Sequence, residues 1–218
     1  MTTASVTKMT ASQYFMLGED PPGLRLELVD GRIVNSTGPI TASQYLMLGE
    51  DPPGVRLELV NGEIVVSPSP SSHHSYIDTQ LRYILVNHIK QHDLGIILGD
   101  VDTIFNKLNV RRPDILFVAK SRLHLIKGHG VPIAPDLCVE ILSPSSATTD
   151  QTEKMDLYAR SGVPYYWIID PQGRTFTAYE LSGKEYVRRA FGRDKAIVKA
   201  APFPACEIPL AELWSPLE

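Results

Sequence analysis

Cysteine is scarce in this chain, and neither cysteine belongs to a CxxC pair. Cys138 and Cys206 are the only two among 218 residues. A disulfide framework is therefore excluded, and both side chains are expected to be buried in a reducing compartment. Hydrophobic residues make up 43% of the chain, which is enough to build a core without covalent cross-links.

Long hydrophobic runs are also missing. No stretch approaches the roughly 20 consecutive apolar residues that a membrane-spanning helix needs. Residues 1–8 lack the apolar centre of a signal peptide. We therefore predict a cytoplasmic protein that has no membrane partner.

An excess of positive charge is the third absence. The chain has 21 Lys and Arg residues against 25 Asp and Glu residues, so its formal net charge is −4. Proteins that hold nucleic acid by electrostatics alone are usually basic. Any contact with phosphate is therefore expected to use a local basic patch or a bound cation.

A tandem repeat is the first feature that is present. Residues 10–34 and residues 41–65 have the same length and almost the same sequence. They differ only at the pairs Phe15/Leu46, Leu24/Val55, Asp30/Asn61 and Arg32/Glu63. Such close identity indicates a recent duplication of one small unit, and two copies are too few for a solenoid.

Each copy predicts a short helix followed by a β-hairpin. A threonine precedes the helix, an Asp-Pro-Pro-Gly turn ends it, and Asn61-Gly62 or Asp30-Gly31 joins two short strands. The second copy runs directly into the following helix, so we assign it to a main domain of residues 41–218. Residues 1–40 are then an appendage that covers a sheet edge, pairs with another subunit, or stays loose.

The remaining chain alternates between helical and strand patterns. Apolar residues at helical spacing predict a long helix from His74 to about His92. We expect single strands at residues 112–119, 136–142 and 165–169, and hairpins at residues 95–105 and 175–189. This mixture predicts an α/β fold with a mixed sheet.

Three residues of this region are candidates for catalysis. Asp114 begins one apolar strand and Glu140 lies inside another, where a lone carboxylate is costly. Two such acids on adjacent strands would each be stabilised by sharing Mg²⁺ or Mn²⁺. Lys154, in the first turn of the next helix, would hold a phosphate or orient a water molecule.

Each candidate also has a structural interpretation. Asp114 follows Pro113 and would fit a turn at the start of a strand. Glu140 would fit an ion pair with an arginine inside the sheet. Lys154 would fit a solvated helix surface. The order of the three residues and their contexts favours a catalytic site.

The motifs together resemble the Uma-two family of restriction-endonuclease-like proteins, a branch of the PD-(D/E)XK nuclease superfamily. The resemblance covers roughly residues 41–215. It depends on Arg56–Val65, Ser67-Pro68 with His74 and Ile77, Arg112–Asp114, Val139–Ser145, Asp150 with Lys154 and Tyr158, and Gly162–Asp170.

The resemblance implies a restriction-endonuclease-like mixed β-sheet flanked by helices. It implies that Asp114 and Glu140 bind the metal and that Glu58 completes the metal shell, with Glu27 as its equivalent in the first copy. The superfamily usually places its lysine two residues after the second acid, where this chain has Leu142. In this branch Lys154 matches the catalytic lysine instead.

The implied activity is metal-dependent hydrolysis of phosphodiester bonds in DNA. Residues His74, Arg112 and Tyr158 are the expected substrate contacts, although His74 would equally suit a capping or packing role. Mg²⁺ or Mn²⁺ is the expected cofactor, DNA the expected partner, and a homodimer the expected assembly. Two alternatives remain open: a catalytically weak nucleic-acid-binding or regulatory module, and a protein that self-associates through its repeat.

Overall fold

The computed structural model describes residues 7–128, 130–143, 149–214 and 216, in two compact units. One unit extends to Ser69 and also includes Ile104–Arg111. The other comprises Pro70–Thr103 and the chain from Arg112 onward. The sequence predicts a domain boundary between the two repeat copies, at residues 40 and 41. The two compact units divide the chain elsewhere and do not test that boundary, which stays a prediction.

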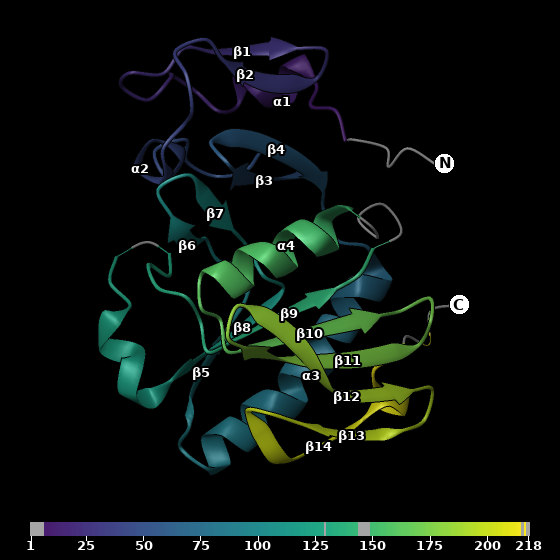
Figure 1. Cartoon of the computed structure of the whole chain (residues 1–218). Coiled ribbons are helices and arrows are strands. Elements are labelled where there is room, and N and C mark those ends of the chain that lie inside the picture. The colour runs from purple at the N-terminus through teal and green to yellow at the C-terminus, as the bar shows by residue number, and fades with distance from the viewer. Residues whose placement is uncertain (1–6, 129, 144–148, 215, 217–218) are drawn as a thin grey trace. The chain divides into compact units, whose positions relative to one another are not determined.

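The N-terminal unit contains a short helix and an antiparallel hairpin in each repeat copy (Figure 1). In both copies the threonine before the helix forms a capping box with a glutamine, Thr10 with Gln13 and Thr41 with Gln44. The elements are α1 (Ala11–Phe15), β1 (Leu26–Val29), β2 (Arg32–Asn35), α2 (Ala42–Tyr45), β3 (Val55–Val60) and β4 (Glu63–Pro68).

The second copy continues into a four-stranded sheet of order β4-β3-β7-β6, in which β6 is Thr103–Asn106 and β7 is Asn109–Arg111. The predicted hairpin at residues 95–105 is therefore wrong. Its first half, β5 (Gly95–Leu98), pairs with β8 (Ile115–Ala119) in a separate six-stranded sheet. The turn before β7 is made instead by the Asn106 side chain, which accepts from the Leu108 N–H at 2.9 Å, as asparagine often does in turns.

The second unit is built on a six-stranded mixed sheet of order β12-β11-β10-β9-β8-β5. Only the β9–β10 pair is parallel among these strands. The strands are β8 (Ile115–Ala119), β9 (Leu137–Ile141), β10 (Tyr165–Asp170), β11 (Thr175–Ser182) and β12 (Glu185–Arg193). A hairpin of β13 (Ile197–Ala200) and β14 (Phe203–Pro209) follows, and short 3-10 turns lie at Lys120–Leu125 and Leu210–Glu212.

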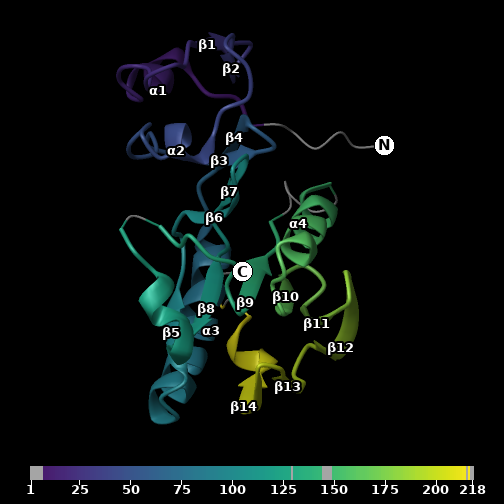
Figure 2. The ribbon, with the colours of Figure 1, turned by 60° about the vertical axis from the view of Figure 1, so that its left-hand side comes forward.

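Two helices, α3 (Ser72–Gln91) and α4 (Thr149–Arg160), lie on opposite sides of this sheet. Both Figure 1 and Figure 2 show this arrangement. The buried face of α3 packs against Leu137, Val139 and Ile141 of β9. Because side chains alternate along a strand, Cys138 and Glu140 point to the α4 side. Tyr158 of α4 is in edge contact with Tyr166 on that side, with ring centroids 5.3 Å apart.

The predicted α/β class with a mixed sheet flanked by helices is confirmed. The long predicted helix is present as α3, and β9 is an internal strand whose residues are all buried. In the part of the chain that the structure describes, no helix is both long and apolar enough to cross a membrane.

Candidate active site

Asp114 directly precedes β8, and Glu140 lies near the end of the neighbouring strand β9. The antiparallel register pairs Ile115 with Val139 and Leu116 with Cys138. Asp114 directly precedes Ile115 and Glu140 directly follows Val139, so both acids lie at the same end of this strand pair. The two carboxylates are close enough for the charge of Asp114 to raise the pKa of Glu140. Each residue is only 6% exposed.

The Glu140 carboxylate receives a hydrogen bond on each oxygen from α4. Lys154 Nζ donates to Oε2 at 2.8 Å, and the Tyr158 hydroxyl donates to Oε1 at 2.6 Å. Burial raises the pKa of Glu140, and the charge of Asp114 raises it further. The two α4 donors lower it only in part, and the resulting pKa is about 7. This carboxyl therefore changes its charge near neutral pH.

The effects on the pKa of the Asp114 carboxyl balance differently from those on Glu140. Burial raises its pKa, but His74, Lys154 and the backbone N–H of Ile141 outweigh that effect, so the pKa of Asp114 lies below its ordinary value. The Ile141 N–H donates to Oδ2 at 2.7 Å, and His74 Nε2 lies 3.1 Å from the same oxygen. Asp114 is the acid of this pair that stays ionised when Glu140 gains a proton.

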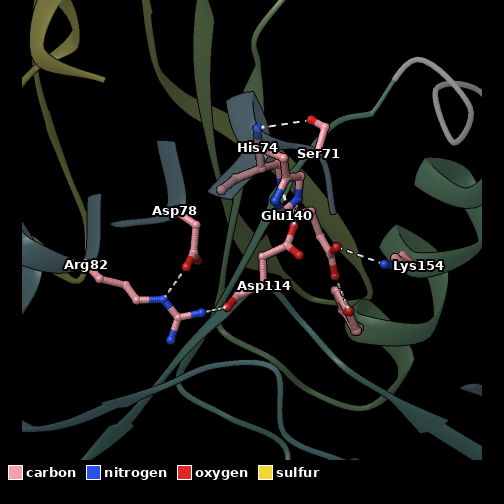
Figure 3. A network of polar contacts seen from close by, with 9 residues as sticks. Ser71, His74, Asp78, Arg82, Asp114, Glu140 and Lys154 are labelled. Atoms are coloured by element: carbon pink, nitrogen blue, oxygen red, sulfur yellow. Dashed lines mark hydrogen bonds and ion pairs between the residues drawn. The ribbon is translucent and has the colours of Figure 1, made fainter. Parts of the chain in front are cut away.

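Helix α3 contributes a row of polar residues to Asp114, at positions separated by one turn (Figure 3). The Ser71 hydroxyl caps the helix by accepting from the His74 N–H at 3.2 Å. Asp78 binds Arg82 Nε at 2.7 Å, and Arg82 Nη2 donates to the backbone oxygen of Asp114. The helix thus contacts both the side chain and the main chain of Asp114.

Asp78 and Arg82 were not identified from the sequence. Their spacing from His74 is i+4 and i+8, which puts all three on one face of a helix. That spacing was the available signal. It did not distinguish a solvated polar face from one directed at Asp114.

The structure brings five of the predicted site residues together: Asp114, Glu140, Lys154, Tyr158 and His74. Lys154 and Tyr158 are one helical turn apart, so both reach the same carboxylate. The structural interpretation of Glu140 expected an ion pair with an arginine. The structure shows an ion pair with Lys154 instead. The catalytic roles of these residues remain predictions.

Two further predicted residues have other contacts. Glu58 belongs to the N-terminal unit, where its Oε2 lies 3.4 Å from Arg111 Nη1. Its role as a metal ligand stays a prediction. Arg112 Nε donates to Asp102 Oδ1 at 2.7 Å, so its guanidinium has an acidic partner within the second unit.

The donor set at Asp114 and Glu140 fits a hard divalent cation. Two buried carboxylates lie close together, and their mutual repulsion contributes to the raised pKa of Glu140. Mg²⁺ is commonly held by one or two carboxylates together with water and substrate phosphate. Among the described residues, no three His, Cys, Asp or Glu side chains form a metal-binding group.

A mixed sheet with two buried acids at one end of neighbouring strands, and a lysine from the following helix, defines a nuclease-like α/β protein. Residues 42–211 match the model of the Uma2 family, described as "Putative restriction endonuclease". The chain belongs to this family, and the predicted resemblance is confirmed.

A solved structure supports the same assignment. It is described as a "putative nuclease belonging to DUF820" from Anabaena variabilis ATCC 29413. The two chains are 25% identical with a TM-score of 0.67, and the match covers 81% of this chain and 98% of the other. The search of curated proteins found no match.

Proposed function

We propose that this protein is a metal-dependent endonuclease that hydrolyses phosphodiester bonds in DNA. One observation carries the proposal: the buried acids Asp114 and Glu140 lie at the same end of the β8–β9 pair, and Lys154 Nζ lies 2.8 Å from Glu140. Two acids and one cation are the groups that phosphoryl transfer requires for positioning and charge stabilisation.

The roles follow from the contacts of each residue. Asp114 and Glu140 would hold Mg²⁺ or Mn²⁺, which when bound neutralises developing charge and lowers the pKa of a coordinated water molecule. Tyr158 orients the Glu140 carboxylate through its hydroxyl at 2.6 Å. Lys154 would hold the scissile phosphate or orient the attacking water. Its flexible side chain would leave Glu140 to make either of these contacts.

The remaining predicted residues would act around this centre. His74 and Arg82 position Asp114 from α3, which supports a positioning role for His74 besides the proposed contact with phosphate. Arg112 remains a proposed substrate contact, whereas Tyr158 is fully buried and would act through Glu140 instead of touching DNA. With a net charge of −4, the protein is expected to bind DNA weakly in the absence of metal.

The assembly and location belong to the same proposal. A homodimer would place two sites on the two strands of a duplex, and closed two-fold assemblies are the commonest among soluble oligomers. A cytoplasmic location would give the enzyme access to DNA. The size of the protein in solution, measured by sedimentation, tests the homodimer.

The decisive experiment combines calorimetric titration of Mg²⁺ and Mn²⁺ with plasmid nicking on the same samples. Wild-type protein is compared with Asp114→Ala and with the isosteric Asp114→Asn. An exposed acid, Asp93→Asn, is the matched control, since Asp93 is 76% exposed in its side chain and lies at the far end of α3.

Saturable metal binding and metal-dependent nicking are expected for wild type and Asp93→Asn, and both should be lost in the two Asp114 variants. Binding without nicking on any DNA substrate would favour the catalytically weak regulatory module. Absence of metal binding in a folded wild-type protein would refute the metal site.

A further inference from the structure

The second repeat copy binds a segment of this chain along one edge of its hairpin. Three backbone N–H groups make the contact. Ala42 donates to the Lys107 oxygen at 2.7 Å, Gly62 donates to the Leu108 oxygen at 2.9 Å, and Asn61 donates to Asn109 Oδ1 at 3.0 Å. The second copy and the segment that it binds both lie within the N-terminal unit.

Side chains extend this contact along β3. Leu59 pairs with Val110 in antiparallel register. Glu58 Oε2 lies 3.4 Å from Arg111 Nη1, and both residues are buried. The segment Lys107–Arg111 is therefore held by main-chain hydrogen bonds, one apolar pair and one ion pair, which is the pattern of a strand added to a sheet edge.

The first copy contains the same groups at the same places. The equivalents of Ala42, Glu58, Leu59, Asn61 and Gly62 are Ala11, Glu27, Leu28, Asp30 and Gly31. The turn has the same geometry, with φ of 50° at Asp30 and 51° at Asn61. Asp30 is the only replacement among the five, and its carboxylate can accept from an asparagine amide as Asn61 Oδ1 does at 3.3 Å.

In the first copy, however, these groups are open to solvent. Glu58 is 7% exposed and Leu59 is fully buried, whereas Glu27 is exposed and Leu28 is only half-buried. Among the described strands β1 pairs only with β2. No described residue accepts from the N–H groups of Ala11, Asp30 or Gly31. Phe15 and Val29 are also exposed, at 77% and 47%.

This open edge is separate from the surface that joins the two copies. The copies contact each other through equivalent atoms: Gln13 Nε2 donates to the Pro53 oxygen at 3.0 Å, and Gln44 Nε2 donates to the Pro22 oxygen at 3.4 Å. Such reciprocal contacts define a local two-fold arrangement. The free edge of β1 therefore remains available while the first copy is anchored.

We propose that the edge of the first copy formed by Ala11, Glu27, Leu28, Asp30 and Gly31 binds an extended segment of a partner protein. The segment has the chemistry of Lys107–Arg111: two successive free carbonyls, then an asparagine, an apolar residue and an arginine. The acidic Glu27 selects the arginine, as Glu58 binds Arg111. Each chain has a single Lys107–Arg111 segment, already bound to its own second copy, so a separate protein is the occupant.

The test uses the full-length protein and a fluorescent peptide with the sequence of residues 104–112, IFNKLNVRR. Anisotropy is expected to show saturable binding with one peptide per chain. The variant Glu27→Arg should weaken binding about tenfold or more, because it replaces a charged hydrogen bond by repulsion. The control Glu19→Arg makes the same charge change at an exposed site of the first copy and should bind like wild type.

A second peptide, with the arginine equivalent to Arg111 replaced by glutamate, should bind Glu27→Arg better than wild type. No binding at millimolar peptide, or equal binding by Glu27→Arg and wild type, would overturn the proposal. Concentration-dependent dimerisation that Glu27→Arg abolishes would make a second copy of this chain the occupant and would also overturn it. None of these readouts depends on nuclease activity.

Discussion

The Tyr158 hydroxyl donates a hydrogen bond to Oε1 of Glu140 at 2.6 Å, from one turn beyond Lys154, which binds the other oxygen. The carboxylate is thus held in one orientation from a single helix. Tyr158 is fully buried, so the hydrogen bond is not replaced by water when the hydroxyl is removed. This pair links the packing of α4 to the charge of the candidate site.

Removal of that hydroxyl in Tyr158→Phe is expected to raise the pKa of Glu140 above about 7, because the hydrogen bond favours the ionised carboxylate. At pH 8 the variant should lose about 1–3 kcal/mol of unfolding free energy, the cost of an unsatisfied buried acceptor. The pH dependence of nicking should move to higher pH. Tyr83→Phe, at a tyrosine 67% exposed, is the control, and an unchanged pH profile in Tyr158→Phe would contradict the role.

The pKa of Glu140 also predicts how stability depends on pH. It lies near 7 in the folded protein and near the ordinary 4.5 in the unfolded chain. The folded protein therefore binds the proton more tightly. The stability contributed by protonated Glu140 is complete below pH 4.5 and is lost as pH rises through about 7, a change of about 3 kcal/mol.

Urea unfolding in the presence of a chelator, at several values between pH 5 and pH 8, tests this. The stability of wild type relative to Glu140→Gln is expected to fall across the range, so that the variant is the more stable protein at pH 8. Asp114 has a lowered pKa and acts in the opposite direction at more acidic pH. A constant difference between the two proteins would show that Glu140 keeps its ordinary pKa.

Substitution of Lys154 separates its charge from its shape. Lys154→Met removes the donor at 2.8 Å from Glu140, and we expect nicking to fall about 10²–10³-fold, as for other single groups that stabilise transition-state charge. Lys154→Arg keeps the charge and should retain part of the activity. Lys184→Met, in the turn between β11 and β12, is the matched control. Full activity in Lys154→Met would exclude a catalytic role for this residue.

Gly99 is expected to be required for the position of Arg82. A Cβ atom at residue 99 would overlap Arg82 Nη2, so Gly99→Ala must displace the guanidinium. Arg82 would then lose its hydrogen bond to the Asp114 backbone, at a cost of about 1–3 kcal/mol in stability.

Metal affinity measured by calorimetry should weaken in Gly99→Ala and to a similar extent in Arg82→Met, since both remove the same contact. The double variant Gly99→Ala/Arg82→Met should bind metal no more weakly than either single variant. Additive losses would mean that the two residues act independently.

The repeat and the strand that carries Glu140 were recognisable from residues alone. Near-identical segments reveal a duplication without any structure, and a continuous apolar run indicates a strand buried on both faces. The long α3 helix followed from apolar spacing. The hairpin expected at residues 95–105 was wrong because periodicity identifies a strand but not its partner: β5 pairs with β8, which lies beyond the β6–β7 hairpin in the sequence.

The sequence by itself determined the family and made the two acids and the lysine candidates for the site, because these depend on residue type and spacing. Only the tertiary structure decided that β8 and β9 are neighbours, which brings Asp114 and Glu140 to the same end of the pair, and that Asp78 and Arg82 face Asp114 rather than solvent. The tertiary structure also decided that the second repeat copy is the one whose hairpin edge binds the segment Lys107–Arg111. Strand pairing joins residues distant along the chain, and their contact energies are set by burial, which local sequence patterns do not contain.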